Sequence, residues 1–306
     1  MRDITLTYNN KLMYNQWLES MIGDDVLSKL YIVPTPIGNL KDITLRSIEA
    51  LKEADVIAAE DTRVTLKLLN HLNIKKSLTS YHQHNEKNKS DFIIDKLNEG
   101  QTVAVVSDAG TPGISDPGSV IIKKCIEEGI EFEVLPGATA FTTALVYSGL
   151  PTESFSFRGF IPRDNKGKKA LIQEVKENRE TLIFYESPHR LIGGLEFLKE
   201  NLGNRRIAIC RELTKMYEEI LRMRIDEAIE YYSNERKPKG EYVLVVEGKT
   251  QEEIEEENKQ VWEDLTIEEH IKVHIENGIR KKDAVKQVAK ERNLPKSEVY
   301  KYSLEI

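Results

Sequence analysis

Residues 102–118 read TVAVVSDAGTPGISDPG, and this stretch decides the fold. Its first five residues form a short apolar run closed by a loop, which is typical of a buried strand in a parallel sheet. The twelve residues that follow hold three glycines and two prolines, whereas a turn from strand to helix needs only about two to six residues. Glycine lets the backbone approach a ligand closely. We therefore interpret 107–118 as a binding loop at the carboxyl end of the strand, where open α/β sheets hold ligands, rather than as a plain turn.

Composition limits the class of protein. The chain has 306 residues, 40% hydrophobic and 31% charged, which indicates a soluble globular protein of about two domains. No apolar run approaches the roughly 18 residues of a membrane helix, and the chain does not begin with a secretory signal pattern. Only two cysteines occur, Cys125 and Cys210, too few for a disulfide framework or a metal set. We therefore expect a cytoplasmic protein.

The charge is unevenly distributed along the chain. The net charge of −7 gives the whole chain no nucleic-acid footprint, but 280–301 carries eight Lys or Arg against three Asp or Glu. A solvated helix surface explains such a run more often than a nucleic-acid site does, so the run is only a hint of nucleic-acid binding.

Short apolar runs alternate with amphipathic segments up to residue 150. Strands are expected at 30–33, 55–59, 77–81, 102–106 and 131–135, and helices at 44–54, before 98 and at 116–128. This alternation predicts a mostly parallel sheet with helices on both faces, and the loops after the strands then share one rim. We assign 29–150 to this N-terminal α/β domain. Residues 1–28 show no clear period and are treated as an N-terminal extension without an assigned function.

The pattern changes after residue 150. Strands are expected at 154–160, 181–185, 206–210, 217–224 and 241–246, and helices at 168–178, 190–201 and 225–233. A second α/β domain with a mixed sheet therefore spans 151–248, and an acidic linker follows at 249–265. The last segment, 266–306, predicts two or three short helices that resemble a helix-turn-helix tail, with Ser297 capping the last one. The fold class is α/β, with two α/β domains and a small helical tail.

Several familiar site motifs do not occur in the sequence. It contains no GxxxxGK[ST] phosphate loop and no GxGxxG between a strand and a helix. It also lacks HExxH, paired CxxC and GxSxG motifs, and we interpret His82 and His84 as a solvated loop pair rather than a metal site. No metal is expected, and an enzyme built on this chain needs an unusual cofactor loop.

Seven blocks, in the same order along the chain, are similar to the tetrapyrrole-methylase superfamily. They are 33–47 (VPTPIGNLKDITLRS), 58–63 (AAEDTR), 107–118 (SDAGTPGISDPG), 135–140 (LPGATA), 185–190 (YESPHR), 210–215 (CRELTK) and 240–248 (GEYVLVVEG). Within the superfamily, the resemblance is to the enzymes that methylate the ribose 2′-oxygen of a cytidine in the decoding region of 16S rRNA. It covers about 29–248 and a similar helical tail, and the N-terminal extension departs from it.

The resemblance implies S-adenosylmethionine in the cleft between the two α/β domains, 16S rRNA within the small ribosomal subunit as substrate, and a homodimer. The cofactor loop of the superfamily carries an acid where this chain has Thr111. Two loops of the N-terminal domain and a few positions of the second domain then bind the cofactor. These positions are Gly110, Thr111, Pro112, Gly113, Ile114, Gly137, Ala138, Thr139, Ala140, Leu213, Gly240 and Tyr242.

Methyl transfer to a ribose hydroxyl needs a general base, such as a carboxylate or a neutral Lys, or a cation that stabilises the developing alkoxide. Charged residues at strand ends are the candidates, and we expect them to line the substrate side of the site. They are Glu60, Asp61, Arg63, Arg211, Glu212 and Lys215, with Glu186, His189 and Arg190 as a further group. The alternative for each group is an ion-pair network between loops. A carboxylate beside Arg63 should keep a low pKa.

RNA recognition needs cations for phosphates and flat side chains for bases. We expect phosphate contacts from the basic loop 162–169 and the tail, and base stacking by Tyr81, His82 and Phe160. Two other functions stay open. A tetrapyrrole C-methyltransferase has the same fold, and its anionic substrate also favours Arg and Lys. A non-catalytic DNA-binding regulator would use the tail and leave the loops at the rim without a purpose.

Overall fold

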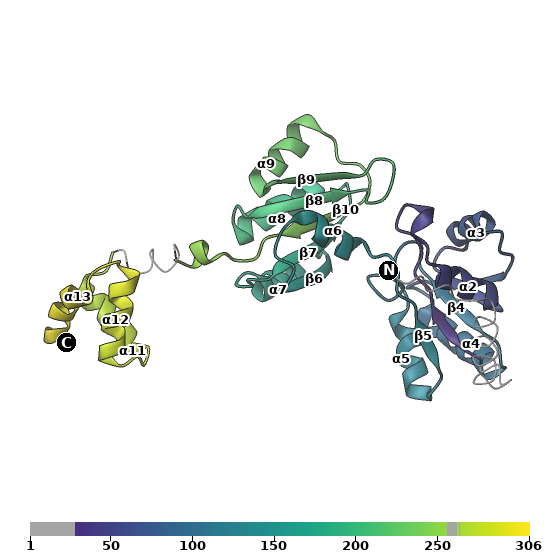
Figure 1. Cartoon of the computed structure of the whole chain (residues 1–306), viewed down its shortest axis with the longest axis horizontal. Helices are drawn as coiled ribbons and strands as arrows, with labels where there is room; N and C mark the ends of the chain where they lie inside the picture. Colours follow the sequence, from purple (N-terminus) through teal and green to yellow (C-terminus); the bar gives the residue numbers. More distant parts are fainter. Residues whose placement is uncertain (1–27, 256–261, 263) are drawn as a thin grey trace, which may run out of the picture. The chain divides into compact units, whose positions relative to one another are not determined.

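The computed structural model describes residues 28–255, 262 and 264–306 (Figure 1). The predicted N-terminal extension lies outside the described residues apart from Ser28, and so do 256–261 and 263 of the predicted linker. The chain forms two compact units. The first unit contains the residues up to Ser148 together with Ile209–Leu221 and Gly240–Val243, and the second contains Gly149–Ala208, Arg222–Lys239 and Leu244–Ile306. The helices of the described residues are all too short or too polar to cross a membrane.

A five-stranded sheet organises the first unit. The strands are β1 (Leu30–Ile32), β2 (Val56–Ala59), β3 (Ser77–Ser80), β4 (Val103–Val106) and β5 (Phe132–Val134). Their order is β3-β2-β4-β1-β5, and each neighbouring pair is parallel, as the sequence predicts. All four side chains of β4 are buried, which explains its continuous apolar sequence.

Helices cover both faces of this sheet. They are α2 (Leu45–Glu53), α3 (Thr62–His71), α4 (Glu86–Asn98), α5 (Ser119–Glu128) and α6 (Ala140–Ser148). Successive residues of a strand point to opposite faces, so Val103 and Val105 pack in one cluster with residues of α4 and α5. Ala104 and Val106 pack in a second cluster with residues of α2 and α3. The predicted two-faced α/β arrangement is confirmed.

Local capping explains where helix predictions fail. The expected helix at 116–128 begins only at Ser119, because Pro117 and Gly118 precede it and Gly118 has a φ of 149°. Helix α7 (Asn165–Val175) begins within the expected basic loop 162–169, because the Asp164 carboxylate accepts the Gly167 N–H at 2.8 Å. The last helix, α13 (Lys296–Tyr302), follows Pro295, so Ser297 lies inside the helix and does not cap it.

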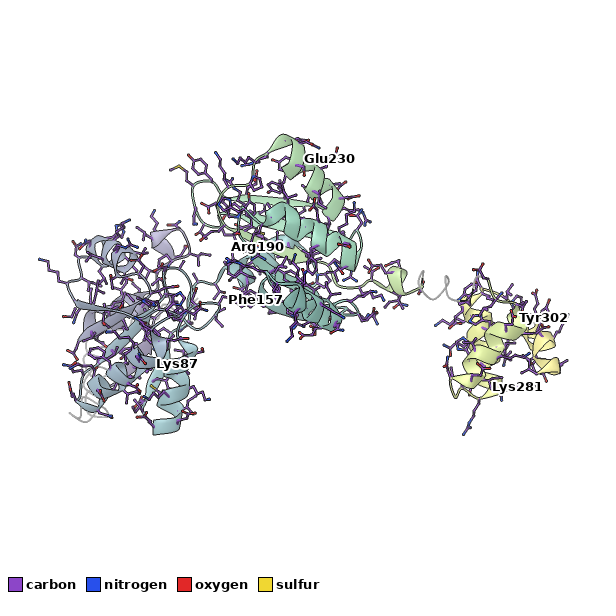
Figure 2. All side chains as sticks on the ribbon, turned by 180° about the vertical axis from the view of Figure 1, so that it is seen from behind. Lys87, Phe157, Arg190, Glu230, Lys281 and Tyr302 are labelled. Atoms are coloured by element: carbon purple, nitrogen blue, oxygen red, sulfur yellow. The ribbon has the colours of Figure 1, made fainter. Side chains whose placement is uncertain are left out.

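A second five-stranded sheet has the order β6-β7-β10-β8-β9. Its strands are β6 (Phe155–Phe160), β7 (Thr181–Glu186), β8 (Arg206–Arg211), β9 (Glu219–Arg224) and β10 (Tyr242–Val246). The helices beside them are α7, α8 (Leu191–Leu202), α9 (Ile225–Glu230) and the π-helix η2 (Tyr231–Glu235). Figure 2 marks Phe157 on β6 and Arg190, the residue that precedes α8.

Three helices form the tail: α11 (Ile267–Glu276), α12 (Lys281–Glu291) and α13. They bury a small apolar core made of Ile271, Ala284, Val285, Val288, Ala289 and Val299. Lys281 and Tyr302 mark the start of α12 and the end of α13 in Figure 2. The prediction of short tail helices is therefore confirmed.

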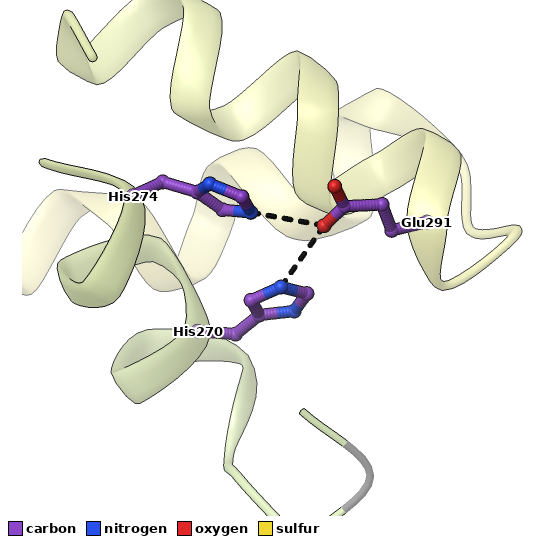
Figure 3. Close-up of side chains that lie close together, drawn as sticks. All are labelled: His270, His274 and Glu291. Carbon is purple, nitrogen blue, oxygen red and sulfur yellow. Dashed lines mark hydrogen bonds and ion pairs between the residues drawn. The ribbon is translucent and has the colours of Figure 1, made fainter. Parts of the chain in front are cut away.

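A polar cluster joins α11 to α12 (Figure 3). The Nε2 atoms of His270 and His274 lie 3.0 and 2.9 Å from the same carboxylate oxygen of Glu291. The Arg292 Nε–H donates to His270 Nδ1 at 3.2 Å. Since arginine is always protonated, this contact assigns the His270 ring proton to Nε2, where it faces Glu291. Metal ligation through Nε2 would need the proton on Nδ1, against the Arg292 donor, so we interpret the cluster as a hydrogen-bonded network.

The stability of the tail should depend on His270. Burial lowers the pKa of His270, and the charges of His274 and Arg292 lower it further against the opposing charge of Glu291. The unfolded chain therefore binds a proton more readily than the folded tail, and stability is lost as the pH falls through the ordinary His range. Hydrogen exchange of tail peptides should show faster opening at pH 5.5 than at pH 7.5. His270→Gln should flatten this dependence, and an equally steep one in that variant would contradict the assignment.

Candidate functional site

Two loops at the carboxyl rim of the first sheet are joined by a main-chain bridge. The Thr35 N–H donates to the Gly110 carbonyl at 2.9 Å, and the Gly110 N–H donates to the Thr35 carbonyl at 3.0 Å. The buried Thr35 hydroxyl also donates to the Ser107 carbonyl at 3.0 Å. The loop after β1 and the loop after β4 are therefore fixed to each other.

The loop after β5 joins the same group. The Thr111 hydroxyl donates to the Ala138 carbonyl at 3.3 Å. A Cβ atom on Gly137 would lie 2.3 Å from Cβ of Pro34, a distance that real side chains do not reach. The structure therefore brings together the two predicted cofactor loops, 110–114 and 137–140.

The loop after β4 has a tightly folded backbone. Gly110 and Gly113 take the left-handed conformation, with φ of 85° and 87°, which glycine adopts at little cost. The Gly113 N–H donates to the Pro117 carbonyl at 3.1 Å and closes the loop. Ser115 inside this closure also has a positive φ, 64°, which is rare for a residue with a side chain.

A segment that is distant in sequence lies against the loop after β1 within the same compact unit. The Asn39 N–H donates to the Thr214 hydroxyl at 3.0 Å. A Cβ on Gly38 would lie 2.5 Å from the Lys215 side chain. Leu213 and Tyr242, two predicted cofactor residues of this region, are buried, so packing occupies much of their side chains.

The predicted group 211–215 forms an ion-pair network, the alternative that the sequence left open. Lys215 Nζ lies 3.0 Å from the Glu212 carboxylate and 2.7 Å from that of Glu241. Burial opposes the charge of Lys215, but the hydrogen bonds with these two carboxylates raise its pKa above the ordinary value. Lys215 therefore stays protonated and is unsuited to act as a neutral base. Arg211 interacts with Glu219 at 4.0 Å.

Asp61 caps helix α3. Its carboxylate accepts the Arg63 N–H at 2.8 Å and pairs with the Arg63 guanidinium at 2.6 Å. The hydrogen bonds from Arg63 lower the pKa of Asp61 to about 2. The predicted low pKa is confirmed. Sequence reasoning missed α3 itself, because the helix follows β2 with almost no loop, although Asp61 before an amphipathic segment is a capping signal.

Glu60 and Asp108 brace the ends of β2 and β4. The Asp108 N–H donates to Glu60 Oε2 at 3.2 Å, and the Asp61 N–H donates to Asp108 Oδ1 at 3.0 Å. Burial raises the pKa of both carboxyl groups. Burial also raises the pKa of Asp116, to about 7, with added repulsion from Glu60, Asp108 and Glu241. Sequence reasoning did not single out Asp108 and Asp116, although they are the acids of the decisive loop.

The predicted RNA-contacting residues differ in exposure. Phe160 is 52% exposed and His82 is half-buried. Tyr81 is fully buried, and its hydroxyl lies 3.3 Å from that of Ser90, so the expectation that Tyr81 stacks on a base is wrong. Lys168, one of the predicted phosphate ligands, lies 5.0 Å from the centre of the Phe197 ring.

The sequence also predicts a charged group of Glu186, His189 and Arg190 in the second unit, and two of these residues are in contact. Glu186 is buried at the end of β7, and its carboxylate lies 3.6 Å from the Arg190 guanidinium. His189 between them in sequence is exposed.

Comparison with known proteins gives one family. Residues 29–229 match the family model described as Tetrapyrrole (Corrin/Porphyrin) Methylases. The "Ribosomal RNA small subunit methyltransferase I" of Halalkalibacterium halodurans is 52% identical over 271 residues, which are 89% of this chain and 93% of the relative. The protein of that name from Bacillus subtilis is 48% identical over 281 residues, with 92% and 96% coverage. The one from Thermotoga maritima is 45% identical over 223 residues, with 73% and 100% coverage.

Solved structures with the same fold are more distant in sequence. The uroporphyrin-III-C-methyltransferase from Thermus thermophilus is 22% identical, with a TM-score of 0.53, over 71% of this chain and 94% of that one. A diphthine synthase is 17% identical, with a TM-score of 0.57, over 73% and 91%. At these identities the likeness shows the fold alone.

The packing of the loops at the rim predicts the effect of one added methyl group. Gly137→Ala should destabilise the protein by about 1–3 kcal/mol, because the added Cβ meets the Pro34 ring, which is closed onto its own backbone and cannot rotate away. The matched control is Gly193→Ala inside α8, where the new Cβ has no neighbour within 4 Å outside the adjacent backbone of its own helix. This control should stabilise the helix by up to about 1 kcal/mol. Urea unfolding measures both changes, and equal stability of Gly137→Ala and the wild type would refute the close packing.

Proposed function

Because this chain belongs to the tetrapyrrole methylase family, we propose that it transfers a methyl group from S-adenosylmethionine to 16S rRNA of the small ribosomal subunit. The proposed acceptor is the ribose 2′-oxygen of a cytidine in the decoding region. The observation that carries the substrate assignment is identity of 43–52% over about nine-tenths of the chain with proteins named for small-subunit rRNA methylation. The alternative of a tetrapyrrole substrate is named by the description of the family model and by solved structures at 22% and 17% identity, a level that shows the fold alone.

The loops at the rim fit a methyl donor of this kind. S-adenosylmethionine supplies an activated methyl group on a positively charged sulfonium. Residues 110–114 and 137–140 would hold it, because the two loops lie together at the rim and Thr111 and Thr139 supply hydroxyls there. The acidic residues beside the loop after β4 are compatible with a cationic donor. Leu213 and Gly240 would contribute from the segment that lies beside the loop after β1.

The residues of the chain contribute mainly alignment. An in-line methyl transfer gains much of its rate from fixing the two reactants and excluding water. The Thr35–Gly110 bridge and the Gly113–Pro117 closure hold the loop after β4 rigid. Glu212 and Lys215 hold the segment over Gly38 rather than exchange a proton. Glu60, Asp61 and Arg63 shape the acceptor side, since they follow β2 at the same rim.

We assign RNA contacts to cations outside the rim. Arg163, Lys166 and Lys169 surround the start of α7, and Phe160 at the end of β6 offers a flat exposed surface. The exposed lysines of α12 supply further phosphate contacts. The net negative charge of the chain restricts RNA binding to such local patches. We also propose a cytoplasmic homodimer that acts on the assembled small subunit.

Methyl-transfer assays test this function. The purified protein is incubated with methyl-labelled S-adenosylmethionine and either small ribosomal subunits or uroporphyrinogen. We expect label in the subunits, recovered after nuclease digestion as 2′-O-methylcytidine. Label in the tetrapyrrole alone would establish the alternative function. Absence of label from both substrates, with intact cofactor binding by calorimetry, would overturn both assignments.

The tail should promote docking and leave cofactor binding unchanged. Lys282→Glu with Lys286→Glu reverses two exposed charges of α12. We expect weaker subunit binding, a shallower dependence of that binding on salt, and an unchanged affinity for S-adenosylmethionine. Lys67→Glu with Lys75→Glu, outside the tail, is the charge-matched control. Equal KM values and salt slopes in the two double variants would remove the tail from RNA docking.

A further inference from the structure

Asp116 differs from Glu60, Asp61 and Glu241 in the contacts of its carboxylate. Asp61 is occupied as a helix cap, Glu60 accepts the Asp108 N–H, and Glu241 pairs with Lys215. The half-buried Asp116 carboxylate makes no hydrogen bond or ion pair within 28–255 or the described part of the tail. It is therefore available to a proton or a ligand.

The backbone fixes the position of Asp116. The Gly113–Pro117 hydrogen bond spans it, and Ser115 before it holds a positive φ of 64°. A Cβ on Gly118 after it would lie 2.7 Å from the Gly113 nitrogen. A residue held in such a strained and closed turn is pre-organised, and strain of this kind gathers at functional sites.

Three carboxylates from other segments of the first unit act on Asp116, and all three carry negative charge. Glu60 follows β2, Asp108 follows β4, and Glu241 precedes β10. Arg63 pairs with Asp61, and Lys215 pairs with Glu212 and Glu241, so both of these cations are engaged with other carboxylates. Burial and the three like charges favour the protonated carboxyl, and the pKa of Asp116 rises to about 7.

A general base works best when its pKa lies near the working pH. Asp61, with a pKa of about 2, binds a proton too weakly to serve. Glu60 and Asp108 also have raised pKa values, but each accepts a backbone N–H, which favours the ionised form. Asp116 combines a raised proton affinity with an unoccupied carboxylate in the loop proposed to bind the methyl donor.

We propose that Asp116 is the general base that takes the proton of the acceptor ribose hydroxyl; this rests on the proposed function. The 2′-oxygen forms a bond to the methyl carbon as the bond from that carbon to sulfur breaks, and the electron pair of the broken bond stays on sulfur. The hydroxyl proton passes to the Asp116 carboxylate. Asp116 then releases the proton to solvent, so that one methyl group is transferred and one proton is released in each turnover.

The test compares Asp116→Asn with Asp95→Asn, the same isosteric change at an exposed position of α4. Single-turnover methylation of small subunits is followed from pH 5.5 to 9. We expect the wild-type rate to fall below a pH of about 7. The rate of Asp116→Asn should be about 10²- to 10⁴-fold lower and should no longer fall as the pH drops below about 7. Asp116→Glu should recover part of the rate. Affinity for S-adenosylmethionine, measured by calorimetry, should stay within a few-fold of wild type.

A second readout does not depend on activity. Because the folded protein raises the pKa of Asp116, the folded state binds its proton more tightly than the unfolded state does. The group therefore destabilises the fold progressively as the pH rises from 3.8, its ordinary pKa, to about 7, and the full cost is present above that pH. Asp116→Asn removes this cost and should raise the Tm at pH 8 but not at pH 4. A merely structural Asp116 would give a lower Tm at both pH values.

Each remaining result counts against the proposal. A rate for Asp116→Asn equal to that of Asp95→Asn would overturn it, as would an unchanged rate with weakened cofactor affinity, which assigns Asp116 to donor binding. A lower Tm with proportional loss of all activities assigns it to folding. If the wild-type protein methylates no RNA while all variants fold, the proposed function fails, and the role of Asp116 fails with it.

Discussion

The pair of main-chain hydrogen bonds between Thr35 and Gly110 is the constraint on which the rim of the first sheet depends. Parallel strands have no tight turn to fix their ends, so the loops that leave β1 and β4 need their own connection. The bridge supplies it and uses the backbone groups of both loops in a nearly dry place, since Thr35 is 4% and Ser107 is 1% exposed. The loop after β5 then packs against the bridged pair through Gly137 and Thr111. Glycine at 110 and 137 therefore serves the contact between loops before it serves any ligand.

The pKa values of Asp61 and Asp116 at this rim differ because their environments differ, although the residue type is the same. Asp61 and Asp116 begin with the same intrinsic pKa, and the structure sets them about five units apart, at about 2 and about 7. An adjacent guanidinium and the backbone of a helix start stabilise the charge of Asp61. Burial among like charges destabilises that of Asp116. Pairs of titratable groups driven apart in this way mark where acid and base roles can be divided.

Sequence reasoning succeeded where the signal is local. The apolar run before 107–118 is short, continuous and closed by glycine and proline, which fixes β4 as a buried strand whatever its neighbours are. It failed where the outcome depends on tertiary neighbours. The aromatic side chain of Tyr81 suits stacking on a base, but it lies in the core beside Ser90. Burial and the charges of Glu60 and Glu241 together raise the pKa of Asp116. These two residues lie more than 50 residues away in either direction, so no short window of sequence contains all three.

Backbone strain in the described residues is concentrated beside the loops at the rim. Five residues other than glycine take a positive φ among the described residues, and two of them are asparagines, which tolerate it. The other three, Ser115, Glu212 and Thr214, lie in the loop after β4 and in the segment beside the loop after β1. Such residues cost about 1–3 kcal/mol each and persist only where surrounding contacts over-determine them. Here the contacts are the Gly113–Pro117 closure, the Lys215 ion pairs and the Asn39–Thr214 hydrogen bond. The strained residues therefore lie where hydrogen bonds and ion pairs between loops hold the backbone in place.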